Sequence, residues 1–341
     1  MRGKSGLVVT LYKLLYRRNT EILGKITGLE PKIFYEGEII DIDRGSSRKF
    51  FLDEENVGII ARYPAKIYIA ENQAITRLTM KHFHRIYKPD IIVIPNVRYE
   101  HMEGLGETIR EIAEAFALGF RNTKYVFYAK STEKYDGEVE KIFRKYTNKY
   151  GVNLITIDIP EKERELPAIE RIYLSEVILK HLGFKITEEE KKEIYNAITE
   201  SLKPSMSPLG IEWYDASKVN DPESTELVIK YLLSRTNKPI YIFAYLRKDR
   251  VDRTQAFQLY FENLSKNDRI KKVWVAGAYR RLILKRLGEK GEAINEEDIM
   301  RIVNIVRSHN GMLILAVNGV NPFVDKVRGI LSGSESFSRN N

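Results

Sequence analysis

Four short apolar runs alternate with helical segments in the first 160 residues of the chain. The runs are rich in β-branched and aromatic residues and are bounded by polar positions, which is typical of buried parallel strands. They cover residues 65–71, 90–96, 124–130 and 152–160. Between them, residues 74–87 and 106–120 carry apolar positions at helical spacing. This alternation predicts an α/β fold with helices on both faces of a parallel sheet.

Residues 165–202 predict two further helices, the second opened by a capping box from Thr187 to Glu190. The Pro-, Ser- and Gly-containing segment 203–210 is the best linker candidate. Strand-like and helical patterns then resume, with strands predicted in the runs 239–247, 271–279 and 311–319. We therefore expect a domain of residues 1–203, a smaller domain of residues 204–331 and a disordered tail of residues 332–341.

The composition describes a soluble globular protein, with 43% hydrophobic and 30% charged residues. The formal net charge of +9 favours anionic partners, although the basic residues are interleaved with 47 acids. The absence of cysteine excludes disulfides, thiolate metal sites and a cysteine nucleophile. The many Lys, Glu, Ile and Tyr residues fit a thermophile. No apolar run approaches the roughly 20 residues of a membrane span and no signal peptide is recognisable, so we expect a cytoplasmic protein.

Two positions in the first half suggest phosphate and metal chemistry. Gly3-Lys4-Ser5 precedes a helical pattern, as in the second half of a Walker A loop. There, backbone amides and Lys4 would bind phosphate oxygens and Ser5 would hold Mg²⁺; the alternative is a basic, frayed terminus. Glu71 stands at the carboxyl end of a predicted strand, where an open α/β sheet binds ligands. It could hold a metal that bridges nucleotide phosphates, or be a solvated acid.

Four segments, Arg2–Ser5, Lys25–Gly28, Arg44–Gly45 and residues 96–103, follow one another along the chain. In this order they resemble segments of the Mur ligase superfamily, and in particular of the ATPase subunit of poly-γ-glutamate synthase. The family's loop ends Thr-Arg-Gly-Lys-Ser, and its helix is followed by Lys-x-Thr-Gly and then Arg-Gly. The chain has Arg2–Ser5, Lys25–Gly28 and Arg44–Gly45 in the same order. The family's Asn-(Val/Ile/Leu)-Arg-x-Asp-His-Leu-Asp segment matches residues 96–103.

That last segment contains both matches and departures. Asn96, Arg98 and His101 agree with the family, while Glu100 and Glu103 replace its two aspartates. The resemblance implies that His101 helps to hold a second metal. The other four histidines are interpreted as structural or surface residues: His82, His84, His181 and His309.

Two further segments of the second domain match the family. In residues 217–225, the resemblance implies that Asn220 and Asp221 point toward the nucleotide while Ser224 and Thr225 cap the next helix. The alternative is a plain helix cap with proline at the helix start. In residues 246–257, three arginines would present forked donors to phosphate and carboxylate groups, or would form one solvated helix face. They are Arg247, Arg250 and Arg253.

The resemblance implies a Mur-ligase-like P-loop ATPase domain with a parallel sheet, plus a smaller Rossmann-like C-terminal domain. It implies an ATP-dependent carboxylate–amine ligase that forms an amide, by extrapolation a γ-glutamyl bond, through an acyl phosphate, with ATP and Mg²⁺ as cofactors. The implied catalytic residues are Lys4, His101 and Arg250. The implied cofactor-binding residues are Arg2, Gly3, Lys4, Ser5, Asn220, Asp221, Arg247, Arg250 and Arg253. The implied metal ligands are Ser5, Glu71 and His101.

The expected partners are a small-molecule or peptide carboxylate and an amine, with a homo-oligomer or a membrane-associated subunit as further partners. Nucleic acid is not expected, because no base-reading motif accompanies the basic charge. A non-catalytic nucleotide-binding or scaffold protein on the same fold is the alternative. Glu100, Glu103 and Ile169, which replaces a family asparagine expected near adenine, favour that alternative.

The first residues also carry an expectation about the native protein. In a Walker A fold, a strand and a glycine-containing loop precede the Gly-Lys-Ser tripeptide. We therefore expect the native protein to extend upstream of Met1 by a short segment of this kind.

Overall fold

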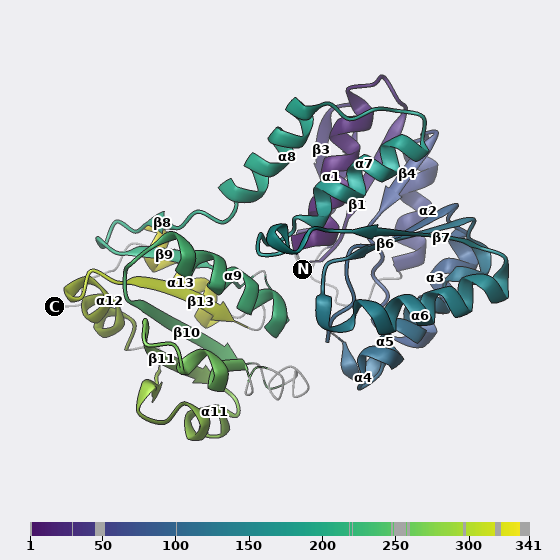
Figure 1. Cartoon of the computed structure of the whole chain (residues 1–341). Coiled ribbons are helices and arrows are strands. Elements are labelled where there is room, and N and C mark those ends of the chain that lie inside the picture. The colour runs from purple at the N-terminus through teal and green to yellow at the C-terminus, as the bar shows by residue number, and fades with distance from the viewer. Residues whose placement is uncertain are drawn as a thin grey trace. The chain divides into compact units, whose positions relative to one another are not determined.

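The computed structural model describes residues 2–28, 30–44, 52–99, 101–217, 219, 221–246, 248, 257, 260–295, 298–317 and 322–334. The chain divides into two compact units (Figure 1). The first unit holds residues 2–164 and 168–198. The second unit holds residues 199–341 together with residues 165–167.

The first unit contains seven described strands, and helices connect or flank them. Its strands are β1 Ile22–Ile26, β2 Lys32–Tyr35, β3 Glu38–Asp41, β4 Ile67–Ala70, β5 Ile91–Ile94, β6 Tyr125–Lys130 and β7 Asn153–Asp158. Its helices are α1 Arg2–Tyr16, α2 Leu52–Arg62, α3 Arg77–Tyr87, α4 Met102–Leu105, α5 Ile109–Ala117, α6 Glu133–Tyr150, α7 Glu170–His181 and α8 Glu188–Glu200, whose last two residues belong to the second unit. The predictions of strands β4 to β7 are confirmed. The strands β1 to β3 were not predicted.

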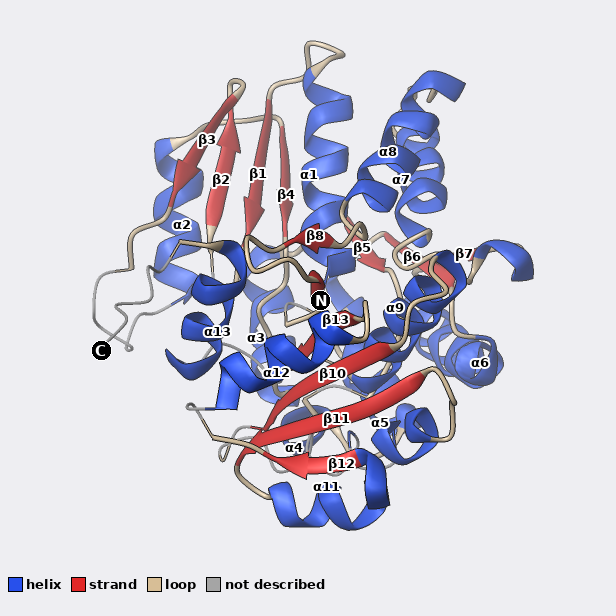
Figure 2. Cartoon of the chain, turned by 90° about the vertical axis from the view of Figure 1, so that its left-hand side faces the viewer, coloured by secondary structure: helices blue, strands red, loops and turns tan. Residues whose placement is uncertain are grey.

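One sheet of the first unit has the order β3-β2-β1-β4, with β1 antiparallel to β2 and parallel to β4 (Figure 2). Helix α1 covers one face, where the rings of Tyr12 and Phe34 lie 5.5 Å apart. Helix α2 covers the other face and packs Ile59 against Leu23 and Ile33. Since α1 packs on one of these faces, its first turn lies against the same sheet that carries Glu71.

The other sheet of the first unit has the parallel order β5-β6-β7. Alternate residues of β6 point to opposite faces: Val126 and Tyr128 join a core formed with α5 and α6, while Phe127 contacts His181 of α7. This alternation is the period expected of a strand buried on both faces. In the described part of this unit, hydrogen bonds join the strands into two sheets, and the predicted α/β fold with parallel strands is confirmed.

The second unit is built on one sheet with the order β12-β11-β10-β13-β9-β8. Its strands are β8 Ser205–Met206, β9 Glu212–Asp215, β10 Ile240–Leu246, β11 Ile270–Gly277, β12 Gly291–Ala293 and β13 Met312–Val317. Its helices include α9 Pro222–Arg235, α11 Arg280–Leu287, α12 Ile299–Ser308 and α13 Pro322–Ser332. All strand pairs are parallel except β8 with β9. Strand order reverses at β10, which lies between β11 and β13, so this unit has a topological switch point at β10.

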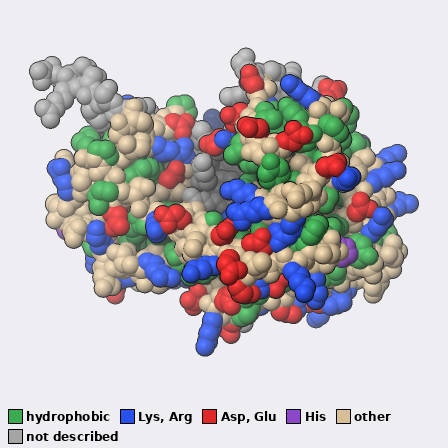
Figure 3. Space-filling view, turned by 90° about the horizontal axis from the view of Figure 1, so that it is seen from above, with side chains coloured by type: hydrophobic (Ala, Val, Ile, Leu, Met, Phe, Trp, Pro, Cys, Tyr) green, Lys and Arg blue, Asp and Glu red, His purple; other side chains and the backbone are tan. Residues whose placement is uncertain are grey.

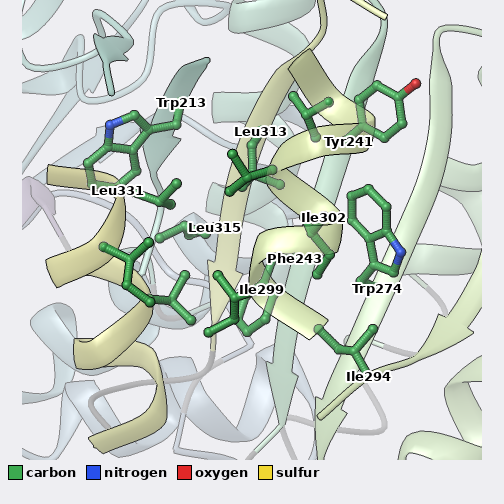
Figure 4. Packing of buried hydrophobic residues seen from close by; sticks show 14 of the residues in the cluster. Trp213, Tyr241, Phe243, Trp274, Ile294, Ile299, Ile302, Leu313, Leu315 and Leu331 are labelled. Carbon is green, nitrogen blue, oxygen red and sulfur yellow. The ribbon is translucent and has the colours of Figure 1, made fainter. Parts of the chain in front are cut away.

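A large apolar core holds the second unit together (Figure 4). Trp274 and Phe243 from the sheet pack with Ile302 of α12, and Leu331 of α13 lies in the same cluster. The rings of Tyr241 and Trp274 stack with centroids 5.5 Å apart. Both tryptophans of the chain, Trp213 and Trp274, belong to this core.

Two local predictions in the connecting region can be compared with the structure. The capping box is confirmed: the backbone amide of Glu190 donates to Oγ1 of Thr187 at 3.2 Å, and the amide of Thr187 donates to Oε2 of Glu190 at 2.9 Å. The segment 203–210 contains the short strand β8. None of the described helices is both long and apolar enough to cross a bilayer.

Candidate nucleotide and metal site

The first turn of α1 contains the three residues that suggested a phosphate-binding loop. The helix begins at Arg2, so Gly3, Lys4 and Ser5 lie where backbone amides lack helical acceptors. Buried apolar residues fix the rest of the helix: Leu7, Val8, Leu11, Tyr12, Leu14 and Leu15. The side chain of Arg2 lies outside the described part of the chain.

Ser5 and Glu71 form the central contact of this region. Strand β4 ends at Ala70, so Glu71 follows at its carboxyl end, as predicted. The hydroxyl of Ser5 donates to Oε2 of Glu71 at 2.8 Å, and the backbone amide of Thr27 donates to the same oxygen at 3.1 Å. Among the described residues, no hydrogen bond reaches the second oxygen, Oε1. Residues 66 positions apart are thus joined at one sheet edge, with a carboxylate oxygen left for a further ligand.

A buried cluster of charges lies beside this contact, on β1 and α2. The Lys25 side chain is 1% exposed and its ammonium donates to Oε1 of Glu55 at 2.6 Å. The guanidinium of Arg44 donates two hydrogen bonds to the same carboxylate, of 2.7 and 2.9 Å. Burial alone would raise the pKa of Glu55, but the hydrogen bonds from Arg44 and Lys25 outweigh it and hold that pKa below its usual range. Burial lowers the pKa of Lys25, although Glu55 opposes the shift.

A second buried carboxylate, Glu170, was not singled out in the sequence. It opens α7, and its Oε1 accepts a hydrogen bond from Nδ2 of Asn96 at 3.3 Å. A Cβ built on Gly3 would lie 3.1 Å from that oxygen, so only glycine leaves normal room there. Burial raises the pKa of Glu170, and the positive charges of Arg98 and Arg171 oppose the rise only in part. Glu170 thus lies beside Gly3 of α1, accepts a hydrogen bond from Asn96 and interacts with the charge of Arg98. The two predicted residues Asn96 and Arg98 therefore lie near the start of α1.

Arg171 also contacts α1 closely. A Cβ on Gly6 would lie 2.3 Å from Nη2 of Arg171, so the guanidinium rests directly on the helix backbone at this glycine. An acid and a base at the start of a helix look like ordinary surface residues in a sequence. Only the packing of α7 on α1 could have identified them. Ile169, which replaces the family asparagine, is buried and offers no polar atom of its side chain.

His101 occupies the N-cap position of α4, with a φ of 51°. A Cβ on Gly104 would lie 2.3 Å from the backbone oxygen of Ile75, so α4 packs directly on the loop that begins at Glu71. This places the helix that His101 opens beside the loop that carries the candidate metal ligand. A role of His101 as metal ligand stays a prediction. Glu103 is exposed, and Glu100 lies outside the described residues.

The second unit supplies less of its predicted site. Asp221 is the N-cap of α9: its carboxylate accepts the backbone amide of Ser224 at 2.8 Å, and Pro222 opens the helix. Ser224 and Thr225, which were expected to cap the helix, lie in its first turn instead, because Asp221 occupies the N-cap position. Asn220, Arg247, Arg250, Arg253 and Gly45 lie outside the described residues.

The structure does describe the strand that precedes these arginines in the sequence. Strand β10 ends at Leu246, directly before Arg247. The carboxyl end of β10 is the switch point of the sheet, where open α/β sheets bind ligands. Gly277, paired with Leu246 at this edge, has a φ of +86°, and a Cβ there would lie 2.2 Å from the Leu246 oxygen. The edge is therefore closely packed on its β11 side.

The donor set at the start of α1 can be tested against the implied magnesium ion. Among the described residues, no three His, Asp or Glu side chains come together as metal ligands. Mg²⁺ usually binds through one or two carboxylates while phosphates and water complete its shell. The Ser5 hydroxyl and the Glu71 carboxylate fit that kind of site, and they do not fit a site made of protein ligands alone.

Charge on the molecular surface is mixed. Figure 3 shows Lys and Arg side chains interleaved with Asp and Glu over the visible face, as the sequence indicated. The net charge of +9 is therefore not gathered on this face.

Comparisons with known proteins concern the family and the fold. Residues 206–327 match the family model of the poly-gamma-glutamate synthase CapB C-terminal domain. A search of curated protein sequences gave no match. Among solved structures, MurF from Acinetobacter baumannii has a TM-score of 0.67 at 12% identity, covering 96% of this chain and 74% of that one.

Folate enzymes are equally similar. E. coli FolC in complex with DHPP and ADP has a TM-score of 0.66 at 14% identity, covering 98% of this chain and 88% of that one. The bifunctional folylpolyglutamate synthase/dihydrofolate synthase from Yersinia pestis CO92 has a TM-score of 0.67 at 12% identity, covering 98% and 87%. These matches confirm the resemblance that the motifs indicated. Residues 206–327 are similar to the poly-gamma-glutamate synthase CapB C-terminal domain, and the chain as a whole has the fold of the Mur ligases and folylpolyglutamate synthases.

Proposed function

We propose that this protein is an ATP-dependent carboxylate–amine ligase. The proposal rests above all on the Ser5–Glu71 hydrogen bond of 2.8 Å at the start of α1 and the carboxyl end of β4. A hydroxyl and a carboxylate at that edge suit a magnesium ion that bridges nucleotide phosphates. The C-terminal domain family and the fold support the reaction class.

The proposed reaction has two steps. A substrate carboxylate attacks the γ-phosphorus of ATP, ADP leaves, and an acyl phosphate forms. An amine then attacks the acyl carbon, phosphate leaves, and the nitrogen loses a proton to give the amide. A site of this kind acts chiefly by positioning two reactants and by neutralising the charge on the transferred phosphoryl group.

Each residue at the start of α1 has a proposed part in that task. The amides of the first turn and Lys4 bind phosphate oxygens. Ser5 and Glu71 would hold the magnesium ion, which would neutralise phosphate charge. His101 is proposed to bind a second ion near the acceptor, from the loop-packed helix α4. The three arginines that follow β10 are proposed as additional anion-binding groups of the second unit.

We propose a γ-glutamyl product as the finer assignment. The support is the match of residues 206–327 to a poly-gamma-glutamate synthase domain, together with a fold that is shared with folylpolyglutamate synthase. The acid and the amine can be identified by amine-dependent release of ADP, with glutamate, glutamyl peptides and other amino acids as acceptors.

The test combines this assay with two variants. Glu71→Ala and Ser5→Ala are expected to fold normally and to lose Mg²⁺-dependent ATP binding and turnover. Glu138→Ala, an exposed acid on α6, is the matched control and should behave as the parent. If Glu71→Ala binds Mg-ATP as tightly as the parent, the metal assignment is wrong. If the parent binds Mg-ATP but no amine stimulates ADP release, the non-catalytic nucleotide-binding function is correct instead.

A further inference from the structure

The charged cluster on β1 and α2 contains an acid that no motif predicted. Glu55 lies on α2, near the start of that helix. It accepts hydrogen bonds from Lys25 at 2.6 Å and from Arg44 at 2.7 and 2.9 Å. Lys25 also bonds to Asn56, the neighbour of Glu55 on the helix. One carboxylate thus balances two cations, of which Lys25 is 1% exposed.

A continuous path of hydrogen bonds leads from this cluster to the candidate metal ligand. The guanidinium of Arg44 donates from Nη2 to Oγ1 of Thr27 at 3.3 Å. The backbone amide of Thr27 donates to Oε2 of Glu71 at 3.1 Å. That oxygen is the one that also accepts the Ser5 hydroxyl. Thr27, which donates to Glu71, therefore accepts a hydrogen bond from Arg44. The guanidinium of Arg44 is in turn oriented by its two hydrogen bonds to Glu55.

The energetics of such a cluster favour a role in positioning. A buried ion pair is seldom more stable than packed apolar groups of the same volume. The removal of one member, in contrast, leaves an uncompensated charge and lets its partners move. Arg44 needs two fixed acceptors to keep its planar fork in one orientation, and Glu55 supplies both.

We propose that Glu55 is a positioning residue for the magnesium site, which acts through Arg44 and Thr27 to fix the orientation of the Glu71 carboxylate. The inference rests on the proposed function, because it assumes that Glu71 binds the metal ion. Groups that orient metal ligands commonly contribute 10–100-fold to metal affinity. Three successive hydrogen-bond contacts separate Glu55 from Glu71, the residue that would bind the ion, so we expect an effect near the lower limit, about tenfold.

The main test measures the Mg²⁺ dependence of nucleotide binding. A non-hydrolysable ATP analogue is titrated into parent, Glu55→Gln and Glu54→Gln proteins at increasing Mg²⁺, and again in EDTA. Glu54 is the exposed neighbour on the same helix and is the matched control. Glu55→Gln should need about tenfold more Mg²⁺ for half-maximal binding of the analogue. In EDTA, its affinity for the analogue should change by less than about threefold. Glu54→Gln should match the parent.

A second pair of variants keeps the test valid if Glu55→Gln does not fold. Arg44→Lys retains the charge beside Glu55 but loses the fork, and Thr27→Val removes the acceptor for Arg44 while it retains the amide. Both should shift the Mg²⁺ requirement in the same direction, Thr27→Val by about threefold. If the variants lower stability and leave the Mg²⁺ requirement unchanged, Glu55 has a structural role only and the inference is wrong. If Glu71→Ala also leaves it unchanged, the proposed metal site itself is wrong.

Discussion

His84 allows a quantitative test of the packing in the first unit. The residue lies on α3 with 5% of its surface exposed, and its ring lies so close to Gly119 that a Cβ there would be 2.4 Å from Cδ2. The oxygen of Asn72 accepts the amide of Ala74 at 2.8 Å, which turns the Asn72 Nδ2 toward Nε2 of His84 at 3.2 Å. Nε2 must therefore accept a hydrogen bond, so the imidazole is neutral and a second proton would face another donor.

The cost of protonation follows from the pKa. Burial lowers the pKa of His84 from its ordinary value of 6.5 to about 4. A group with a depressed pKa in the folded state stabilises the fold above pH 6.5, and that stability is lost as the pH falls from 6.5 toward 4. At pH 4.5 the unfolded chain is almost fully protonated at this position. The linkage relation then gives a loss of about 2.5 kcal/mol relative to pH 7.5.

Urea unfolding at pH 7.5 and pH 4.5 measures this loss. Both tryptophans lie in the second unit, so their fluorescence reports that unit, whereas far-UV circular dichroism reports both units. In His84→Asn, the free energy of unfolding of the first unit should fall between the two pH values by about 2.5 kcal/mol less than in the parent. The tryptophan transition should be the same in both proteins. Equal pH dependence of the first unit in parent and variant would refute the reasoning.

Two further predictions concern the backbone. Gly277→Ala should destabilise the second unit by about 2 kcal/mol or more, seen by tryptophan fluorescence, because its positive φ and its contact with the Leu246 carbonyl both exclude a side chain. Its counterpart Gly137→Ala, in α6 with open space around it, should instead stabilise the first unit by up to about 1 kcal/mol; a loss of stability there would contradict the packing argument. Limited proteolysis should cut within residues 203–210 and bound nucleotide should slow the cleavage, as for a hinge. A rate that is independent of nucleotide would count against the hinge.

Among the strands that the sequence predicted, β6 carries the clearest signal. In β6, Val126, Phe127, Tyr128 and Ala129 are all buried, so an unbroken apolar run carries the signal. In β3, Glu38, Ile39 and Asp41 are exposed and no such run exists. That strand forms only because the turn after Tyr35 folds it back on β2. Short, exposed strands of a meander depend on their neighbours and leave little pattern in the sequence.

The same distinction applies to the candidate site. Glu71 could be predicted because its position after a buried strand determines where it lies in the sheet. Glu55 and Glu170 could not, because each is an acid near the start of a helix, where acids are common on any surface helix. Their importance arises from contacts over 30 and 74 positions of sequence, with Lys25 and Asn96. Such contacts exist only once the helices have packed.

The two carboxylates near the start of α1 differ in a way that separates their roles. Glu170 is buried, and its pKa is raised because burial disfavours the charged form more than Arg98 and Arg171 favour it. Its Oε1 accepts the hydrogen bond from Nδ2 of Asn96 at 3.3 Å, which suits Glu170 to hold Asn96 in place. Glu71 is only half-buried and receives hydrogen bonds from Ser5 and Thr27 on a single oxygen. Among the described residues, no hydrogen bond reaches the other oxygen of Glu71, so of the two carboxylates Glu71 is the one that we propose as the magnesium ligand.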